Sequence, residues 1–370
     1  MSSRTGDRGR GEEDAPPRPP RRRGGHPERA KATISRVADA AGVSRATVSR
    51  VMNGTSTVAP ELVARVRAAA EALNYEPSPV ARSLALGRTS TVSLIVPDLA
   101  NPMFQDVLRG LSNAAAEEGH RLLVAESNEN AGEEAILAVE ARRRSDGLVL
   151  ASPRVPEEEL RSLSERLAPL VLLNRELPGS SVPSLSVDYA AGIKEIVAHL
   201  VAFGHRHLVY LSGPEASTSN RDRIAALHAA AVLGPGFTLT ELACGATFED
   251  GHQAARAAVA TGATAVVAYN DMVAFGAMSG LRELGLDIPG DISITGFDDI
   301  PFARYTSPPL TTASIPRNEL GRQAWGRLWA LMNGGPVAHN VRFQPRLLVR
   351  DSTGPVPDRP ASGRRRKGSA

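Results

Sequence analysis

The hydrophobic pattern of the chain changes character near residue 90. Between residues 33 and 73, small and apolar residues recur at helical spacing in three short runs. From Thr91 onward, short runs of valine, leucine and isoleucine alternate with longer helical patterns. This alternation is typical of parallel sheets with helices on both faces. We therefore predict an α/β chain in which a small helical head precedes two doubly wound parallel sheets.

The first two helical runs predict a helix-turn-helix. Segment 34–41 has one apolar face, and Thr33 before it is a suitable N-cap. Gly42 suits the left-handed backbone that a tight turn between helices needs. Ser44 then caps a second helix, which ends at Asn53. A third helical run beginning near Pro60 has its own packing face, so that three helices share one core.

The second helix of this head has the features of a DNA-reading helix. Its valines share an inward face, whereas Arg45 and Arg50 project elsewhere. A short helix fits the major groove, where arginine recognises guanine edges. An ordinary helical hairpin with solvated arginines is the alternative. The predicted DNA-binding residues of the head are Thr33, Ser44, Arg45, Ala46, Thr47, Ser49, Arg50 and Asn53.

Two segments of the chain together resemble the lactose-repressor (LacI/GalR) family of bacterial transcription regulators. They are TISRVADAAGVSRATVSRVMNG at 33–54 and NYEPSPVARSLALGRT at 74–89. In that family the second segment contains a hinge helix that enters the minor groove, and an apolar side chain there unstacks and bends the DNA. The resemblance therefore implies DNA contacts at Ala81, Arg82 and Leu84. Packing of Leu84 on a neighbouring helix is the alternative.

The same resemblance extends to about Ser352. It is carried by segments that include PDLANPMF at 97–104 and HLVAFGHRHLVYLSGP at 199–214. The family fold is similar to two-lobed periplasmic sugar-binding proteins, whose chain crosses between lobes three times. The implied organisation has a disordered tail (1–32), a helix-turn-helix domain (33–76), a hinge helix with linker (77–90), a first lobe (about 91–187 and 315–343), a second lobe (about 188–314 and 344–352) and a second disordered tail (353–370).

Polar and aromatic residues follow the predicted strands, where open parallel sheets bind their ligands. The set is Asp98, Phe104, Asn174, Ser219, Arg223, Asn270 and Asp298. Amide, carboxylate and guanidinium groups beside an aromatic wall suit a polyhydroxylated ligand such as a sugar. The resemblance implies effector contacts at all of these except Asp98 and Ser219. Helix capping is the alternative role for Asp98, and a structural ion pair is the alternative for Arg223 with Asp298.

The charge distribution favours a DNA-binding head on an acidic body. The formal net charge is +3, with +4 in residues 1–32, +3 in residues 33–90, +4 in residues 353–370 and −8 in the remainder. Phosphate binding requires such a basic end. The two tails are rich in arginine, proline and glycine and have little to bury, so we expect them to be disordered.

Motifs of catalysis are missing from the sequence. It contains no Gly-rich phosphate loop, no His-Glu-x-x-His, no Gly-x-Ser-x-Gly and no metal-ligand spacing among its histidines. A dinucleotide-dependent oxidoreductase would need Gly-x-Gly-x-x-Gly after the first strand, where the chain reads PDLANP. The single cysteine allows no internal disulfide. We therefore expect no catalytic residue, no metal and no cofactor.

These observations predict a transcription regulator, specifically a repressor, rather than an enzyme. Its expected partners are near-palindromic operator DNA, a small sugar-like effector and a second copy of the chain. The chain has no signal-peptide pattern and no apolar run of membrane-spanning length, so we expect a cytoplasmic protein without membrane contact. A transport-type sugar-binding protein is the alternative. The carboxyl terminus has no leucine heptads, which favours a dimer over a tetramer.

Overall fold

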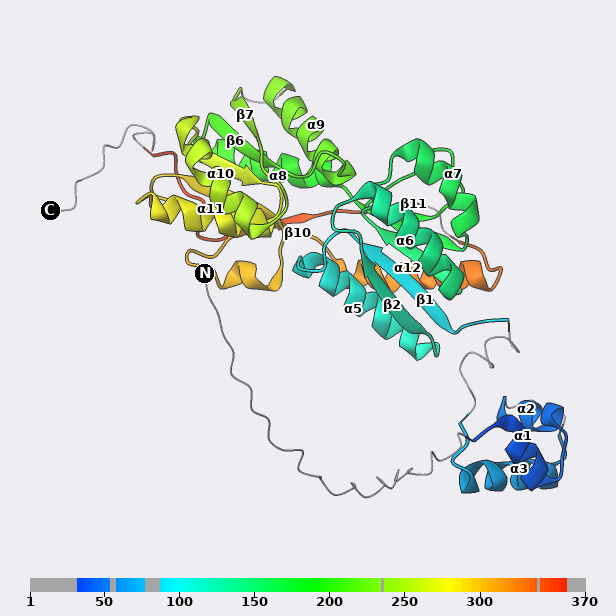
Figure 1. The fold of residues 1–370 in the computed structure, drawn as a ribbon. Coiled ribbons are helices and arrows are strands. Elements are labelled where there is room, and N and C mark those ends of the chain that lie inside the picture. Colours follow the sequence, from blue (N-terminus) through cyan, green and yellow to red (C-terminus); the bar gives the residue numbers. More distant parts are fainter. Residues whose placement is uncertain (1–31, 54–57, 77–86, 234–235, 338–339, 358–370) are drawn as a thin grey trace, which may run out of the picture. The chain divides into compact units, whose positions relative to one another are not determined.

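The computed structural model describes residues 32–53, 58–76, 87–233, 236–337 and 340–357 (Figure 1). The chain forms two compact units, which divide between residues 82 and 83. The predicted hinge contacts Ala81, Arg82 and Leu84 lie outside the described residues, as do residues 1–31 and 358–370 of the two predicted tails.

The amino-terminal unit is the predicted three-helix head. Its helices are α1 (Ile34–Ala41), α2 (Arg45–Met52) and α3 (Pro60–Ala72). One small core joins them, to which Val37 of α1, Val48 of α2 and Val66 of α3 contribute fully buried side chains. The prediction of a helix-turn-helix with a third packing helix is confirmed.

Short-range signals set the ends of the first two helices. The Thr33 hydroxyl accepts a hydrogen bond of 3.4 Å from the backbone N–H of Arg36, and Ser44 accepts one of 3.1 Å from Thr47. Gly42 adopts φ 62°, the left-handed conformation that ends α1. Arg65 of α3 then donates a 2.5 Å hydrogen bond to the carbonyl of Ala41. The third helix thereby fixes the turn from outside it.

The larger unit contains two six-stranded sheets. The first has the order β11-β5-β4-β3-β1-β2, and the second has the order β12-β10-β9-β8-β6-β7. All neighbouring strands are parallel except β12, which runs antiparallel to β10. The first-sheet strands are β1 (Thr91–Val96), β2 (Arg121–Glu126), β3 (Gly147–Ala151), β4 (Leu170–Leu173), β5 (Ser184–Val187) and β11 (Asn340–Phe343). The second-sheet strands are β6 (His207–Ser212), β7 (Thr238–Ala243), β8 (Ala265–Ala268), β9 (Ser293–Asp298), β10 (Thr311–Ser314) and β12 (Arg346–Leu348).

We call each sheet with its helices a lobe. The helices of the first lobe are α5 (Pro102–Glu117), α6 (Ala131–Arg144), α7 (Glu157–Leu167) and α12 (Arg317–Met332). Those of the second lobe are α8 (Tyr189–Ala202), α9 (Thr218–Leu233), α10 (Phe248–Ala260) and α11 (Asp271–Glu283), with the 3-10 helix η1 (Pro301–Arg304). The chain passes between lobes after β5, after β10 and after β11.

Alternation along the strands explains why each sheet is covered on both faces. Leu94 of β1 packs into one core with Val107 of α5, whereas its neighbour Ile95 packs into another with Leu160 of α7. Successive strand residues point to opposite faces, so a continuous apolar run fills two cores. The predicted α/β class with two doubly wound sheets is confirmed.

Two features differ from the sequence-based expectation. The pattern did not predict strands β5, β7, β10, β11 and β12 or helices α7 and α12, because several of these elements are short or mix polar with apolar residues. Thr353 and Gly354, at the start of the predicted disordered tail, belong to the folded body. Thr353 is buried and bonds to His199 at 2.8 Å, and the carbonyl of Gly354 lies 3.1 Å from His205.

None of the helices in the described part of the chain combines the length and hydrophobicity needed to span a bilayer.

Candidate nucleic-acid interface and ligand cleft

Helix α2 presents its polar residues outward. Val48 and Val51 are buried in the head, whereas Arg45, Ala46 and Arg50 are exposed. No described carboxylate forms an ion pair with either arginine. Arg50 donates a 3.4 Å hydrogen bond to the carbonyl of Ala46, and its role and that of Arg45 in DNA binding stay predictions.

The remaining predicted contacts of the head are more tied to the fold. Thr33 and Ser44 use their hydroxyl groups as helix caps, although both residues are exposed. Thr47 shares a 3.0 Å hydrogen bond with the Ser44 hydroxyl. Asn53 donates a 3.3 Å hydrogen bond to Ser49. We predict that these polar side chains contact phosphates or base edges only when they break the hydrogen bonds described here and form new ones to DNA.

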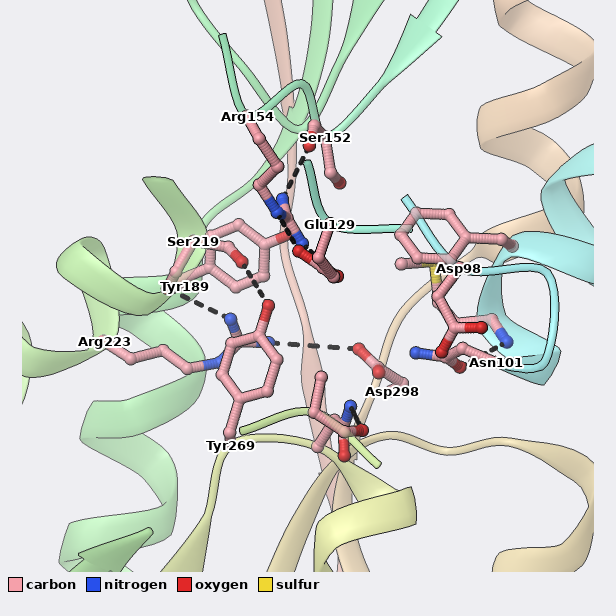
Figure 2. Close-up of a pocket in the computed structure, with 14 residues that line it drawn as sticks. Asp98, Asn101, Glu129, Ser152, Arg154, Tyr189, Ser219, Arg223, Tyr269 and Asp298 are labelled. Atoms are coloured by element: carbon pink, nitrogen blue, oxygen red, sulfur yellow. Dashed lines mark hydrogen bonds and ion pairs between the residues drawn. The ribbon is translucent and has the colours of Figure 1, made fainter. Parts of the chain in front are cut away.

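In the larger unit, strand ends from both sheets meet at one cleft, which Figure 2 shows in close-up. Six of the seven predicted effector contacts line it: Asp98, Phe104, Ser219, Arg223, Asn270 and Asp298. The others that line it are Asn101, Met103, Glu129, Ser152, Arg154, Tyr189, Ala246 and Tyr269. The two lobes thus contribute acidic, basic, amide and aromatic groups to one site.

Arg223 is the central cation of the cleft. Its guanidinium carbon lies 4.2 Å from the ring centroids of Tyr189 and Phe297 and 4.8 Å from that of Tyr269. One guanidinium nitrogen lies 3.9 Å from a carboxylate oxygen of Asp298. Aromatic faces attract a desolvated cation, so the rings hold Arg223 in place beside a distant counterion. Its Nε atom is buried and has no hydrogen-bond partner among the described residues.

Buried carboxyl groups lie next to this arginine. Burial raises the pKa of Asp298 to about 6, although the charges of Arg223 and Arg317 act in the opposite direction. Asp271 accepts hydrogen bonds of 2.6 Å from Thr312 and 2.7 Å from the backbone of Ile300. Its pKa is raised well above the ordinary value, first by burial and then by the charge of Asp298. The two carboxyl groups therefore disfavour simultaneous ionisation.

Asn270 and Asp98 have local structural roles in this structure. Asn270 caps α11 by accepting a 2.8 Å hydrogen bond from Val273, and it donates one of 3.0 Å to the carbonyl of Ala246. Asp98 accepts a 2.7 Å hydrogen bond from Ala100, but Asn101 is the residue that caps α5. Burial raises the pKa of Asp98.

The sequence-based set missed Arg154 and Glu129, which form an ion pair on the first-lobe side of the cleft (Figure 2). Arg154 also donates a 2.6 Å hydrogen bond to the carbonyl of Ser152 and a 2.9 Å bond to Glu129. The rule that found the other residues also applies here, because Glu129 follows β2 and Arg154 follows β3. Tyr189 and Tyr269 likewise follow β5 and β8.

The cleft is closed in this structure. Its free volume is about 20 Å³, which is room for roughly one water molecule. A sugar-sized ligand would therefore require the lobes to separate.

Asn174, the seventh predicted contact, lies elsewhere. It lines a neighbouring cavity of about 580 Å³, and its amide donates a 3.2 Å hydrogen bond to the hydroxyl of Ser152. Asn174 thus stands between the cleft and this second cavity, and its part in effector binding stays a prediction.

A helix-turn-helix head with an exposed reading helix, joined to a two-lobed body with a polar cleft, defines a ligand-responsive DNA-binding protein. Residues 33–78 match the family described as bacterial regulatory proteins, lacI family, and residues 197–353 match a periplasmic binding protein-like domain. The HTH-type transcriptional regulator GalR of Escherichia coli (strain K12) is 35% identical over 329 residues, which cover 87% of this chain and 95% of GalR. The chain belongs to the lacI family of bacterial transcription regulators.

Solved structures agree with this assignment. A crystal structure of the lac repressor dimer bound to operator and the anti-inducer ONPF is similar with a TM-score of 0.77 and 27% identity, covering 88% of this chain and 99% of that one. A complex of the transcriptional regulator CelR with cellobiose is similar with a TM-score of 0.65 and 26% identity, covering 87% and 100%. Family membership makes this protein a DNA-binding regulator and not an enzyme.

Proposed function

We propose that the protein is a homodimeric repressor whose operator affinity changes when a small polyol binds in the cleft. The observation that carries this proposal is the convergence of Arg223, Asp298 and Asp98 from two lobes in one cleft, in a chain that also has an exposed DNA-reading helix. Polyols are recognised by such sets of charged groups beside aromatic rings. The similar lac repressor and CelR structures, which hold operator and cellobiose, support the proposal.

Arg317 supplies a direct connection between the lobes. From the first turn of α12 it makes a 2.8 Å ion pair with Asp106 of α5, in the first lobe. It also donates a hydrogen bond to the backbone carbonyl of Asp298, at the end of β9 in the second lobe. A ligand held by the Asp298 carboxylate acts on this junction, so the angle between lobes responds to the effector.

The proposed signal then reaches the DNA through segment 77–90. We propose that the lobe angle shifts this linker, where Ala81, Arg82 and Leu84 are predicted DNA contacts, and that paired linkers of a dimer meet at the centre of a near-palindromic operator. The effector can act only through unequal affinity for two arrangements of the lobes. A protein that binds chromosomal operators works in the cytoplasm, which is where we place it.

Selection from a random-duplex pool at moderate salt tests this function. We expect the full-length protein to enrich a palindrome with a central pyrimidine–purine step, because such steps kink easily. Binding to the selected duplex is then repeated with a panel of sugars. Failure to enrich any sequence would contradict the proposal.

Calorimetry tests the effector mechanism separately. The sugar that changes operator binding is titrated into free protein and into the operator-bound protein. Linkage requires two different dissociation constants. Equal constants would reject control through the cleft while leaving the DNA-binding function intact.

A further inference from the structure

The second cavity contains a buried arginine that forms no ion pair with any described residue. Arg175, the residue after Asn174, is 5% exposed and lines the cavity of about 580 Å³ between the lobes. No described carboxylate lies within ion-pair distance of its guanidinium group. Isolated charges are costly to bury and are normally paired, so this cation requires a partner.

Two guanidinium groups converge on one neutral oxygen in this cavity. Arg175 donates a 2.5 Å hydrogen bond to the hydroxyl of Thr218, across the lobe boundary. Arg221, one turn along α9 and exposed, donates a 3.1 Å hydrogen bond to the same oxygen and bonds of 3.3 and 3.4 Å to the carbonyls of Glu215 and Ala216. The two guanidinium groups repel each other, and the hydroxyl that they share has no charge to offset this repulsion. An oxyanion bound between the two groups would do so, with bonds that charge strengthens.

One neighbouring polar atom also lacks a partner among the described residues. The amide oxygen of Asn174 is buried and accepts no hydrogen bond from any described residue. Thr218 is the first residue of α9, and Ser217 before it caps this helix, because its hydroxyl accepts from the N–H of Asn220 and its carbonyl from that of Arg221. A protonated oxyanion or a ligand hydroxyl would satisfy the Asn174 oxygen.

The carboxylates that line the cavity form no ion pair with Arg175 or Arg221, although the charge of Glu157 acts on Arg175 and that of Asp222 on Arg221. Glu157 pairs with Arg161 at 2.9 Å, and Glu176 pairs with Arg342 at 2.6 Å. Asp188 caps α8 by accepting a hydrogen bond from the N–H of Ala191, and it also accepts one from Gln344. The charges of Arg223 and Arg342 affect Asp222 more strongly than the charge of Arg221 does. Burial, followed by the charge of Arg221, lowers the pKa of Arg175, and the charges of Glu157 and Glu134 oppose this shift only in part.

We propose that Arg175, Arg221 and Thr218 form an anion subsite that binds a phosphate or carboxylate group. An anion there joins Arg175 of the first lobe to α9 of the second and so stabilises the closed arrangement. This inference rests on the proposed function in one respect, because it makes the effector an acidic sugar derivative such as a sugar phosphate. The subsite itself requires no knowledge of the operator.

Calorimetry of the full-length protein with inorganic phosphate, in a buffer free of other oxyanions, tests the subsite. We expect saturable binding that Arg175→Gln and Arg221→Gln each weaken at least ten-fold. Arg256→Gln, an exposed position on α10 outside both cavities, serves as the matched control and leaves binding unchanged. Absence of phosphate binding by the wild-type chain, or equal loss in the control, would overturn the proposal.

Two further measurements separate the possible causes. Thermal unfolding of each variant checks its fold, and phosphate should raise the unfolding temperature of the wild type but not of Arg175→Gln. Glucose 6-phosphate and glucose are titrated in parallel. Preference for the phosphorylated sugar over both glucose and inorganic phosphate is the expected result, whereas equal affinity for the two phosphates would overturn the assignment of the anion to the effector. The operator selection is carried out without added phosphate or sugar phosphate. Its failure would therefore count against the proposed function and not against the anion subsite.

Discussion

A guanidinium nitrogen of Arg223 lies 3.9 Å from a carboxylate oxygen of Asp298 inside the closed cleft, and both residues are almost fully buried. The guanidinium carbon of this arginine also lies 4.2 Å from the ring centroids of Tyr189 and Phe297. Because the ion pair is long, it offsets the burial of Asp298 only in part, and the pKa of Asp298 stays raised at about 6. Burial of the Asp298 carboxyl group therefore outweighs the attraction of Arg223 in the closed cleft.

The first prediction concerns pH. The pKa of Asp298 is about 6 in the folded chain, against an ordinary value of 3.8. Between pH 3.8 and about 6 the folded state keeps the Asp298 proton, whereas the unfolded state releases it. The resulting contribution to the free energy of unfolding is complete below pH 3.8 and is lost as pH rises through about 6. The difference corresponds to about 3 kcal/mol at 1.36 kcal/mol per pH unit. Denaturant unfolding from pH 4 to pH 7 measures it, and Asp298→Asn should remove this part of the slope. An unchanged slope in the variant would contradict the assignment.

Removal of the central cation should destabilise the folded state at neutral pH. Arg223→Met leaves the Asp298 carboxylate buried without its nearest cation, which costs about 3 kcal/mol at pH 7. The loss should shrink at pH 5, where Asp298 is protonated. The double variant Arg223→Met/Asp298→Leu is the control and should recover most of the stability, since neither charge is then buried. Thermal unfolding at the two pH values distinguishes these outcomes.

Close packing of α5 against α12 depends on a glycine. A Cβ atom on Gly321 would lie 2.1 Å from the carbonyl oxygen of Val107, so Gly321→Ala should destabilise the body by about 1 to 3 kcal/mol. Gly326 lies in the same helix, and a Cβ atom added there would meet no other atom within 4 Å. Gly326→Ala should instead stabilise by about 0.5 to 1 kcal/mol, because alanine is the better helix former. Similar effects at both positions would argue against the observed helix contact.

The exposed arginines of α2 should read bases. Arg45→Ala or Arg50→Ala is expected to relax base preference at one position of each half-site by about 1 to 3 kcal/mol. Binding to a set of single-base operator variants measures this effect. Arg67→Ala, on the exposed side of α3, is the control and should leave the preference unchanged. A uniform loss over all sequences would reassign the α2 arginines to phosphate contacts.

The predicted hinge contact Leu84 has its own test. Leu84→Ala should weaken binding to the selected operator far more than binding to random duplex, because an apolar wedge acts only on a specifically bent site. Titrations of both duplexes at several salt concentrations give the two affinities. Equal losses on both would reject the wedge.

Much of this protein was evident from local sequence signals. The caps Thr33 and Ser44 and the turn at Gly42 act within three or four residues of their own positions, so the helix-turn-helix was predictable without its tertiary contacts. Apolar runs such as β1 and β3 also predicted the α/β body, because strands buried on both faces contain little else. The rule that ligands bind beyond strand ends then brought six of seven predicted residues to one cleft.

The tertiary structure decided what depends on partners distant in sequence. Strand β7 has exposed polar positions and becomes a strand because it pairs with β6. The ion pair of Arg154 with Glu129 joins two separate loops, and the contact of Arg175 with Thr218 joins two lobes. Residue type and spacing do not predict these contacts, because the contacts depend on how the sheets and lobes pack. The sequence thus determined the elements and the class of protein, while packing determined which charges are buried together and which lack a counterion.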